Sequence, residues 1–349
     1  MFSHCKLDAL AKASKPYEGI THRFNISDFQ GYAGHLDPSV VSRLRDHSDV
    51  HAIESDKLWT TAAMTRQMHS GYGLDYISHR STKGRSKSVY LYDDTAGADT
   101  FAYIIDSGIN IGHFEFEGRA SLGYNAVRSV PFDDFLGHGT HVAGVVGSRL
   151  YGVAKCCNLI AVKVTHTETS SMSSIMDGYQ WAARDIVQRR RQDKAVINVS
   201  LYGDYSPAFN RLVDAAFASG ISTVVCAGNL GVEAAGTSPA SARGAITVGA
   251  TDSRQERAHF SKWGPTVSIF APGVDILSTW VGSRAVTSED YGTSVASACV
   301  AGLVLYFKRC FSLPDAKSTR QFVLGIATPE VVRSSKGSKN LFAYNGSKR

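Results

Sequence analysis

The sequence contains no hydrophobic run long enough to span a membrane. Its longest strongly apolar stretch, residues 295–307, is well short of the roughly 20 residues that a membrane helix needs. This stretch reads as a buried core helix, so we predict no membrane partner. The first 19 residues also lack the apolar core that a secretory signal requires.

The cysteines form no metal-binding pattern. There are six of them, with no C-x-x-C pair and no zinc-ligand spacing, so no metal site is predicted from them. Cys156 and Cys157 are adjacent in the chain and poorly placed to bridge each other. Disulfide bonds remain possible, but the spacing does not dictate their pairing.

The positive charge is not gathered into a nucleic-acid-binding surface. The formal net charge is +6, and the densest basic cluster is 189–191 at the end of an amphipathic segment. Cations at the end of a helix are favoured by the helix dipole and by solvent. We therefore predict no nucleic-acid partner.

Short apolar runs alternate with helical patterns from about residue 101 onward. Apolar residues at helical spacing occupy 172–187 and 209–217, and Gly220 is a plausible stop for the second helix. Strands that are apolar at every position are typical of parallel sheets covered on both faces. We predict an α/β fold, with a doubly wound, mostly parallel sheet flanked by helices and strands at 101–106, 159–164, 195–200, 221–226 and 245–250.

The front of the chain differs in character from the rest. Residues 37–56 predict one short helix, with Val40, Val41 and Leu44 on one face, followed by a strand. We therefore expect two domains, a small α+β unit at 1–62 and the main domain at 63–349. Residues 62–100 are rich in Gly, Ser, Thr and Tyr and predict a connection along the surface.

Four polar residues stand at the ends of predicted elements. Asp106 ends the first strand, His138 precedes a helix of small residues, Asn229 follows another strand, and Ser294 begins the apolar helix. Each residue alone is more often a turn or capping residue. Because ligand sites in parallel sheets form at the carboxyl ends of strands, we expect the four to meet there.

Together these four residue types are the components of acyl-transfer chemistry. A serine hydroxyl needs a nearby base to take its proton. An imidazole base needs a carboxylate to orient it and to stabilise its charged form. The tetrahedral oxyanion needs fixed donors, which a side-chain amide and a backbone N–H at a helix start can supply. The pattern therefore predicts a serine hydrolase.

Seven segments carry a resemblance to a known family. They are YIIDSGIN, GHGTHVAG, VINVSLYG, CAGN, SPASARGAITVGATD, IFAPGVDILSTW and YGTSVASACVAGL. Over roughly residues 63–308 the chain resembles the subtilisin-like serine proteases, in particular the fungal secreted branch that contains proteinase K and the cuticle-degrading proteases. The chain order Asp, His, Ser is also that of the subtilisins.

The resemblance implies a serine endopeptidase made as a self-processing zymogen and acting on proteins or peptides. It implies the triad Asp106, His138 and Ser294, with the Asn229 amide in the oxyanion hole. The edge formed by Ser200, Leu201, Tyr202 and Gly203 would pair with extended substrate.

LRDHSDVHAIESDKLW (44–59) is similar to the family's inhibitory prodomain. Residues 1–62 would therefore be an intramolecular inhibitor that is removed near Ala62 or Ala63. We expect a monomer that is secreted, and we therefore expect the start of this chain to be truncated.

The sequence departs from the family pattern at the strong calcium site. The resemblance implies carbonyl ligands from 241–246 and a carboxylate at position 268, where this chain has Ser268. A serine supplies an oxygen but no charge to a cation that prefers carboxylates. We expect this site to be lost, with Arg243 filling part of the space. Asp252 and Asp275 are nearby carboxylates that could substitute.

Two tyrosines add bulk to the expected substrate cleft, so the sequence also allows functions other than proteolysis. Tyr202 replaces a glycine of the substrate edge, and Tyr291 adds bulk before Gly292. One alternative is therefore a weak or inactive interaction protein on a protease fold. Another is an esterase of the α/β-hydrolase type, which would need G-x-S-x-G and the order Ser, Asp, His, and this chain has neither.

Overall fold

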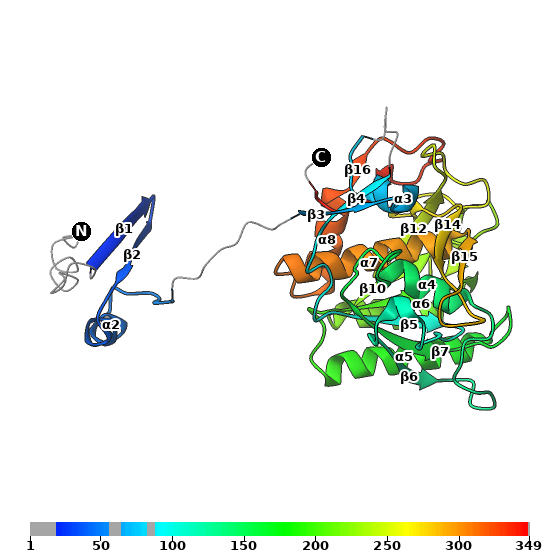
Figure 1. Cartoon of the computed structure of the whole chain (residues 1–349), viewed down its shortest axis with the longest axis horizontal. Coiled ribbons are helices and arrows are strands. Elements are labelled where there is room, and N and C mark those ends of the chain that lie inside the picture. The colour runs from blue at the N-terminus through cyan, green and yellow to red at the C-terminus, as the bar shows by residue number, and fades with distance from the viewer. Residues whose placement is uncertain (1–18, 56–63, 82–87, 348–349) are drawn as a thin grey trace. The chain divides into compact units, whose positions relative to one another are not determined.

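A computed structural model describes residues 19–55, 64–81 and 88–347. The chain divides into two compact units, Met1–Ala62 and Ala63–Arg349, and each is described by itself (Figure 1).

The smaller unit is a hairpin followed by a helix. Strands β1 (Gly19–Ile26) and β2 (Phe29–His35) pair antiparallel. Helix α2 (Pro38–Arg45) begins where the Asp37 carboxylate accepts a hydrogen bond from the Ser39 N–H at 2.8 Å. The predicted α+β character is therefore present, and Val40, Val41 and Leu44 are half-buried as the helical spacing predicted.

The strand predicted after this helix is wrong within the described residues, because residues 46–55 contain no strand. A strand needs a partner for its backbone groups, and here β1 and β2 pair with each other.

The larger unit is built on a nine-stranded sheet in the order β16-β17-β13-β12-β10-β8-β5-β7-β6. The seven strands from β13 to β6 are parallel, and short antiparallel β16 (Thr328–Pro329) extends the sheet beyond β17 (Leu341–Phe342). The seven parallel strands are β5 (Phe101–Asp106), β6 (Ala120–Asn125), β7 (Asn158–Lys163), β8 (Ala195–Val199), β10 (Ser222–Cys226), β12 (Ala245–Thr251) and β13 (Ile269–Pro272). The predicted doubly wound, mostly parallel sheet is confirmed.

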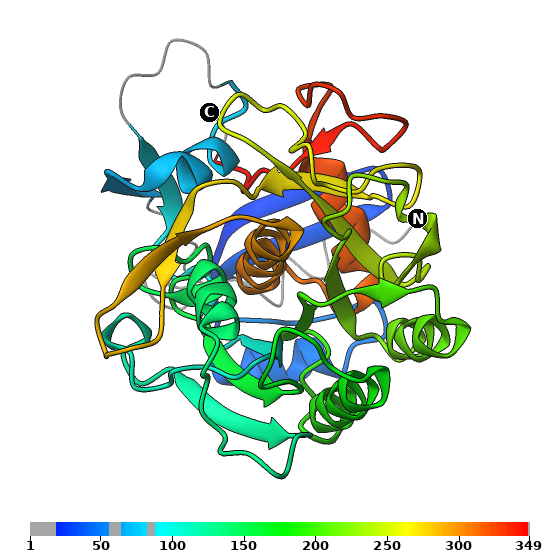
Figure 2. The ribbon, with the colours of Figure 1, turned by 90° about the vertical axis from the view of Figure 1, so that its right-hand side faces the viewer.

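Helices cover both faces of the sheet. Helices α4 (His138–Gly147) and α7 (Thr293–Cys310) pack in the larger apolar core on one face. Helices α5 (Met172–Gln188) and α6 (Pro207–Ala218) pack in a second core on the other face. Figure 2 shows α7 nearly end-on in the middle of this unit. Helix α7 is buried from Thr293 to Lys308, as its apolar sequence predicted, and α8 (Ala316–Ile326) packs beside it.

The described residues 64–81 and 88–100 form more regular structure than the surface connection that their composition predicted. Strands β3 (Met64–Met68) and β4 (Val89–Asp93) pair antiparallel, and α3 (Gly71–Ile77) lies between them in the chain. Ile77 and Tyr90 are fully buried, and the Tyr90 hydroxyl donates to the Val153 carbonyl at 2.9 Å. The surface prediction is wrong for α3 and β4, because their apolar side chains Leu74, Ile77, Tyr90 and Leu91 are buried in the core, whereas Met64 and Met68 of β3 are exposed.

The remaining short elements of the described residues are two antiparallel strand pairs and two 3₁₀ helices. β9 (Gly203–Asp204) pairs antiparallel with β11 (Thr237–Ser238), and β14 (Ile276–Thr279) pairs with β15 (Thr287–Asp290). Two 3₁₀ helices are η1 (Phe114–Phe116) and η2 (Ala234–Gly236).

Candidate active site

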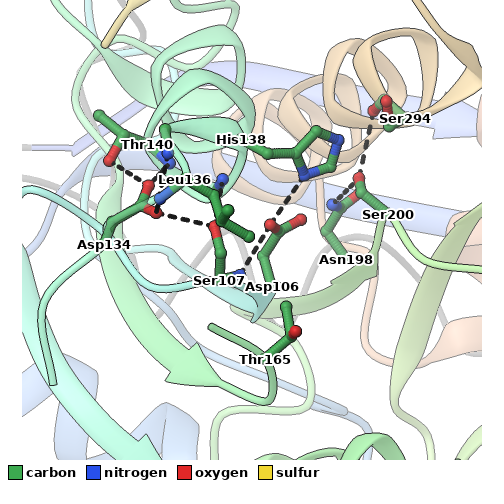
Figure 3. Close-up of polar contacts among 12 residues, drawn as sticks. Asp106, Ser107, Asp134, Leu136, His138, Thr140, Thr165, Asn198, Ser200 and Ser294 are labelled. Carbon is green, nitrogen blue, oxygen red and sulfur yellow. Dashed lines mark hydrogen bonds and ion pairs between the residues drawn. The ribbon is translucent and has the colours of Figure 1, made fainter. Parts of the chain in front are cut away.

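Asp106 and His138 form a hydrogen-bonded pair at the carboxyl edge of the sheet (Figure 3). Asp106 ends β5 and is 1% exposed, and its Oδ1 accepts hydrogen bonds from His138 Nδ1 at 2.8 Å and from the Ser107 N–H at 2.7 Å. Burial lowers the pKa of His138, but the Asp106 carboxylate outweighs burial, and the pKa rises from 6.5 to about 9. The carboxylate therefore fixes the tautomer with its proton on Nδ1 and leaves Nε2 to act as a base.

Asp134 holds the start of the helix that carries His138. It is 7% exposed, and its Oδ1 accepts from the N–H groups of Leu136 and Gly137, both at 3.0 Å. Its Oδ2 accepts from the N–H and hydroxyl of Thr140 at 2.9 and 2.6 Å. A carboxylate at a helix N-terminus satisfies free N–H groups and complements the helix dipole.

The glycine after His138 allows helix α4 to approach the aspartate strand. A Cβ at Gly139 would lie 2.2 Å from the Gly108 carbonyl oxygen and 3.1 Å from the Asp106 side chain. Any larger residue would push His138 away from Asp106. This contact gives a physical reason for the glycine that follows His138.

Ser294 lies in the first turn of α7, and Figure 3 shows the His138 ring between Asp106 and Ser294. The serine is 6% exposed. Gly292 precedes the helix with φ of 152°, and a Cβ there would lie 2.8 Å from Ser294 Oγ and 3.3 Å from Asn229 Nδ2. The serine hydroxyl and the asparagine amide therefore face one point, which only glycine leaves open.

Thr293 fixes the direction of the Asn229 amide. Asn229 Oδ1 accepts from the Thr293 N–H at 3.0 Å and from its hydroxyl at 2.7 Å. Because a backbone N–H can only donate, the oxygen must face Thr293, and the Nδ2 donors face the serine. Thr293 Oγ1 also accepts from the Gly228 N–H at 3.0 Å, which ties the asparagine turn to α7.

The structure brings together the four residues at element ends that the sequence selected. It adds Asp134, Thr293 and Gly292, to which the sequence analysis gave no role in the site. The available signal was position alone: Asp134 stands four residues before His138, and Gly292 and Thr293 directly precede Ser294.

Segment 200–203 follows β8 and lies beside the start of α7. Ser200 is buried, and its hydroxyl donates to the Ser294 carbonyl at 3.2 Å (Figure 3). Gly203 pairs with Ser238 in the β9–β11 ladder. Leu201 and Tyr202 are half-buried between these two attachments.

Tyr202 reaches across to the asparagine turn. Its Cδ2 lies 3.1 Å from the point where a Gly228 Cβ would stand, so the ring packs against the backbone beside Asn229. Tyr291, by contrast, is 65% exposed, and its ring lies 5.6 Å from that of Phe260. Of the two tyrosines, therefore, only Tyr202 contacts the turn after β10 that carries Gly228 and Asn229.

The residues at the expected calcium position do not fit that ion. Ser268 is 3% exposed and brings no carboxylate. The Arg243 carbonyl accepts a hydrogen bond from the Arg320 guanidinium, and the Gly244 N–H donates to Asp214 at 2.7 Å. The Arg243 side chain itself is exposed. The cation beside this carbonyl is therefore Arg320, not Arg243 as the sequence predicted.

The alternative carboxylate Asp252 is engaged elsewhere. It accepts hydrogen bonds from the Arg254 side chain at 3.0 and 3.1 Å and from the N–H groups of Arg254 and Glu256 at 2.8 and 3.0 Å. Across the described residues, no group of three or more His, Cys, Asp or Glu side chains could hold a metal ion.

Two further observations concern the cysteines and the membrane. The described cysteines, from Cys156 to Cys310, are all free thiols, and Cys5 lies outside the described residues. Within residues 19–55, 64–81 and 88–347, every helix is too short or too polar to span a bilayer.

Comparison with known proteins matches two families to the two units. The subtilase family matches residues 97–339, and the peptidase inhibitor I9 family matches residues 3–62. The chain is 48% identical to alkaline protease 1 of Aspergillus clavatus over 328 residues, which cover 94% of this chain and 80% of the relative. It is 46% identical to alkaline protease 1 of Emericella nidulans, over 95% of this chain and 81% of the relative.

A solved structure shows the same fold. The crystal structure of a cold adapted subtilisin-like serine proteinase superposes with a TM-score of 0.72 at 33% identity, and covers 78% of this chain and 97% of that one. The esterase alternative is therefore wrong. The chain belongs to the subtilase family of serine endopeptidases, carries an inhibitor I9 propeptide, and is related to the fungal alkaline proteases.

Proposed function

We propose that this endopeptidase cleaves peptide bonds through an acyl-enzyme on Ser294, with His138 as the base and Asp106 orienting it. The observation that carries the proposal is the shared point in front of Gly292, which Ser294 Oγ and Asn229 Nδ2 both face. A carbonyl carbon near that point would meet the nucleophile, and its oxygen would meet the amide donor.

The steps follow from the protonation states. Neutral His138 takes the Ser294 proton on Nε2 as Oγ attacks the carbonyl carbon, and Asp106 stabilises the imidazolium. The oxyanion is held by Asn229 Nδ2 and by the Ser294 N–H at the start of α7. His138 then gives its proton to the leaving amine. Water repeats the sequence and releases the acid.

Substrate is proposed to bind as an extended strand along Ser200, Leu201, Tyr202 and Gly203. The support is position: the segment runs from the Ser294 carbonyl to the β9–β11 ladder, so a strand along it would pass the nucleophile. The expected partners are protein and peptide chains, and we expect the enzyme to act as a monomer outside the cell, as the resemblance implies.

A serine-directed fluorophosphonate probe tests the catalytic assignment. Processed wild-type protein should be labelled and should cleave casein, whereas Ser294→Ala should lose labelling and fall to background cleavage. Ser297→Ala, one turn further along α7, is the matched control and should keep labelling. Wild-type activity in Ser294→Ala would overturn the assignment.

Residues 1–62 are proposed to be the inhibitory prodomain, removed by self-cleavage near Ala62 or Ala63. This junction lies outside the described residues. The support is the I9 match to residues 3–62, which ends where the subtilase unit begins. N-terminal sequencing should find a new N-terminus there in wild-type protein and not in Ser294→Ala. A fully active wild-type protein that still begins at Met1 would contradict processing.

A further inference from the structure

A buried lysine runs beneath the turn that carries Asn229. Lys262 is 6% exposed, and its backbone N–H donates to the Gly228 carbonyl at 2.9 Å. Its Cδ lies 2.9 Å from the point where a Gly228 Cβ would stand. The turn can therefore lie on the lysine stem only because residue 228 has no side chain.

The ammonium of Lys262 has unused capacity to bind an anion. Its Nζ donates to Thr237 Oγ1 at 2.5 Å and lies 5.7 Å from the centre of the Tyr202 ring. Among the residues that the structure describes, no carboxylate lies within 4.0 Å of it. An ammonium has three donors, and a buried charge without a counter-ion is costly.

Burial lowers the pKa of Lys262, and the field of Asp204 opposes this shift. Asp204 and Thr237 are cross-strand partners in the β9–β11 ladder. The Nζ–Thr237 hydrogen bond places the ammonium at this ladder. Besides Asp204, the titratable group that acts on the pKa of Lys262 is Cys226, which also raises it.

The proposed substrate path leads a side chain toward this ammonium. In this arrangement the scissile carbonyl lies between Ser294 and Asn229, and the substrate backbone runs along residues 200–202. The substrate side chain on the acyl side would then point between residues 200–202 and the turn that carries Gly228. The Tyr202 ring lies against Gly228 there, with its Cδ2 3.1 Å from the point where a Gly228 Cβ would stand, so the side chain would enter beside the ring. Lys262 runs along Gly228, and its ammonium lies at Thr237.

We propose that Lys262 is a specificity-determining residue that selects substrates with a carboxylate side chain on the acyl side of the scissile bond. The proposal rests on the catalytic assignment above. A glutamate or aspartate side chain would supply the counter-ion that the described residues lack, through a charge-assisted hydrogen bond. A lysine or arginine side chain would be repelled in the same water-poor space.

Three peptides that differ only at this position measure the selection. They carry Glu, Gln or Lys on the acyl side of one fluorogenic bond, and kcat/KM is measured on the processed full chain at pH 8. Glu should exceed the isosteric Gln by about 10- to 100-fold, the range for a hydrogen bond between charged groups. Lys should be the poorest of the three. Equal values for Glu and Gln would overturn the proposal.

Two variants separate charge from structure. Lys262→Met removes the ammonium and should bring the Glu-to-Gln ratio to about one, whereas Lys262→Arg keeps a cation and should keep the preference for Glu. Lys308→Met is the matched control, because it removes another buried ammonium. The Lys308 ammonium donates to the Gln192 carbonyl at 2.8 Å and takes no part in the site. It should leave the ratio unchanged.

The outcomes also separate this proposal from the catalytic one. If Lys262→Met proves unstable, the wild-type ratio and the Arg variant still decide. Fluorophosphonate labelling with a flat Glu-to-Gln ratio would overturn the role of Lys262 and leave Ser294 standing. Absence of labelling and of all cleavage would contradict the assignment of Ser294, and the role of Lys262 with it.

Discussion

In the proposed mechanism His138 takes a proton from Ser294 only while its ring is neutral, so its partner carboxylate would set the pH range of activity. Asp106 raises the pKa of His138 to about 9, and the neutral fraction grows as the pH passes that value. We expect kcat/KM on a peptide without titratable groups to rise with pH toward an alkaline plateau. The midpoint should lie well above 6.5, the ordinary value for histidine. A pH–rate profile measures it.

Asp106→Asn is the matched variant for this profile, because it keeps the shape of the side chain and removes its charge. The midpoint should fall, since burial of His138 is then unopposed by the ion pair. The rate should fall by about 10⁴, as the same change does in serine proteases of another fold. A midpoint that stays in place would show that another group sets the pKa.

At this scale the sequence predicted the residues that are proposed to carry chemistry, but not those that hold them in place. Asp106, His138, Asn229 and Ser294 stand out because polar residues at the ends of buried elements are unusual. Asp134 does not stand out, because the adjacent Asp133 is also an aspartate at nearly the same distance in sequence from His138. Asp134 accepts hydrogen bonds from backbone N–H groups. Every residue type except proline has such a group, so the sequence does not indicate which of them bond to Asp134.

At the scale of elements, burial on both faces decided which strands could be predicted. The five predicted strands match β5, β7, β8, β10 and β12 to within about one residue, because each is apolar at nearly every position. The strands β1 and β3 are polar and largely exposed, so no alternation marked them. Pairing with a neighbouring strand defines such elements, and a partner cannot be identified from local composition.

The segment after β8 carries a prediction about substrate size. Tyr202 packs against Gly228 and so narrows the space between the ends of β8 and β10. We expect the enzyme to prefer smaller side chains on the acyl side, and Tyr202→Gly to raise kcat/KM for bulky ones. A peptide-library profile of both proteins tests this. Tyr205→Gly removes an exposed ring two residues beyond segment 200–203 and should leave the profile unchanged. Identical profiles for wild type and Tyr202→Gly would contradict a role for the ring.

Size and charge at this place are separable. Tyr202 limits the volume of the entering side chain, whereas Lys262 acts on its charge. The Tyr202 variant should therefore keep the preference of Glu over Gln, and Lys262→Met should keep the preference for small side chains.

At the scale of the whole molecule, the two family matches cover residues 3–62 and 97–339, and the departures named above, at positions 202, 243, 268 and 291, lie outside the helices and strands. The calcium position is the clearest example. Its residues come from three separate regions: the Arg320 guanidinium of helix α8 bonds the Arg243 carbonyl in the loop before β12, and the Ser268 N–H donates to the Thr247 carbonyl of β12 at 2.8 Å. The sequence predicted the lost carboxylate at Ser268, but it could not show that Arg320, some 77 residues beyond Arg243, would reach that loop.

We predict that this enzyme is stable without calcium, because the Arg320 guanidinium already bonds the Arg243 carbonyl and position 268 has no carboxylate. An ion bound only by the folded state would add about 2.7 kcal/mol at a hundredfold excess over its Kd. We expect the Tm of the processed enzyme to be nearly the same in millimolar calcium and in excess chelator. Arg320→Ala should lower the Tm equally in both, and Arg211→Ala, on an exposed part of α6, should not. A rise of several degrees with calcium in the wild type would show that a tight site survives.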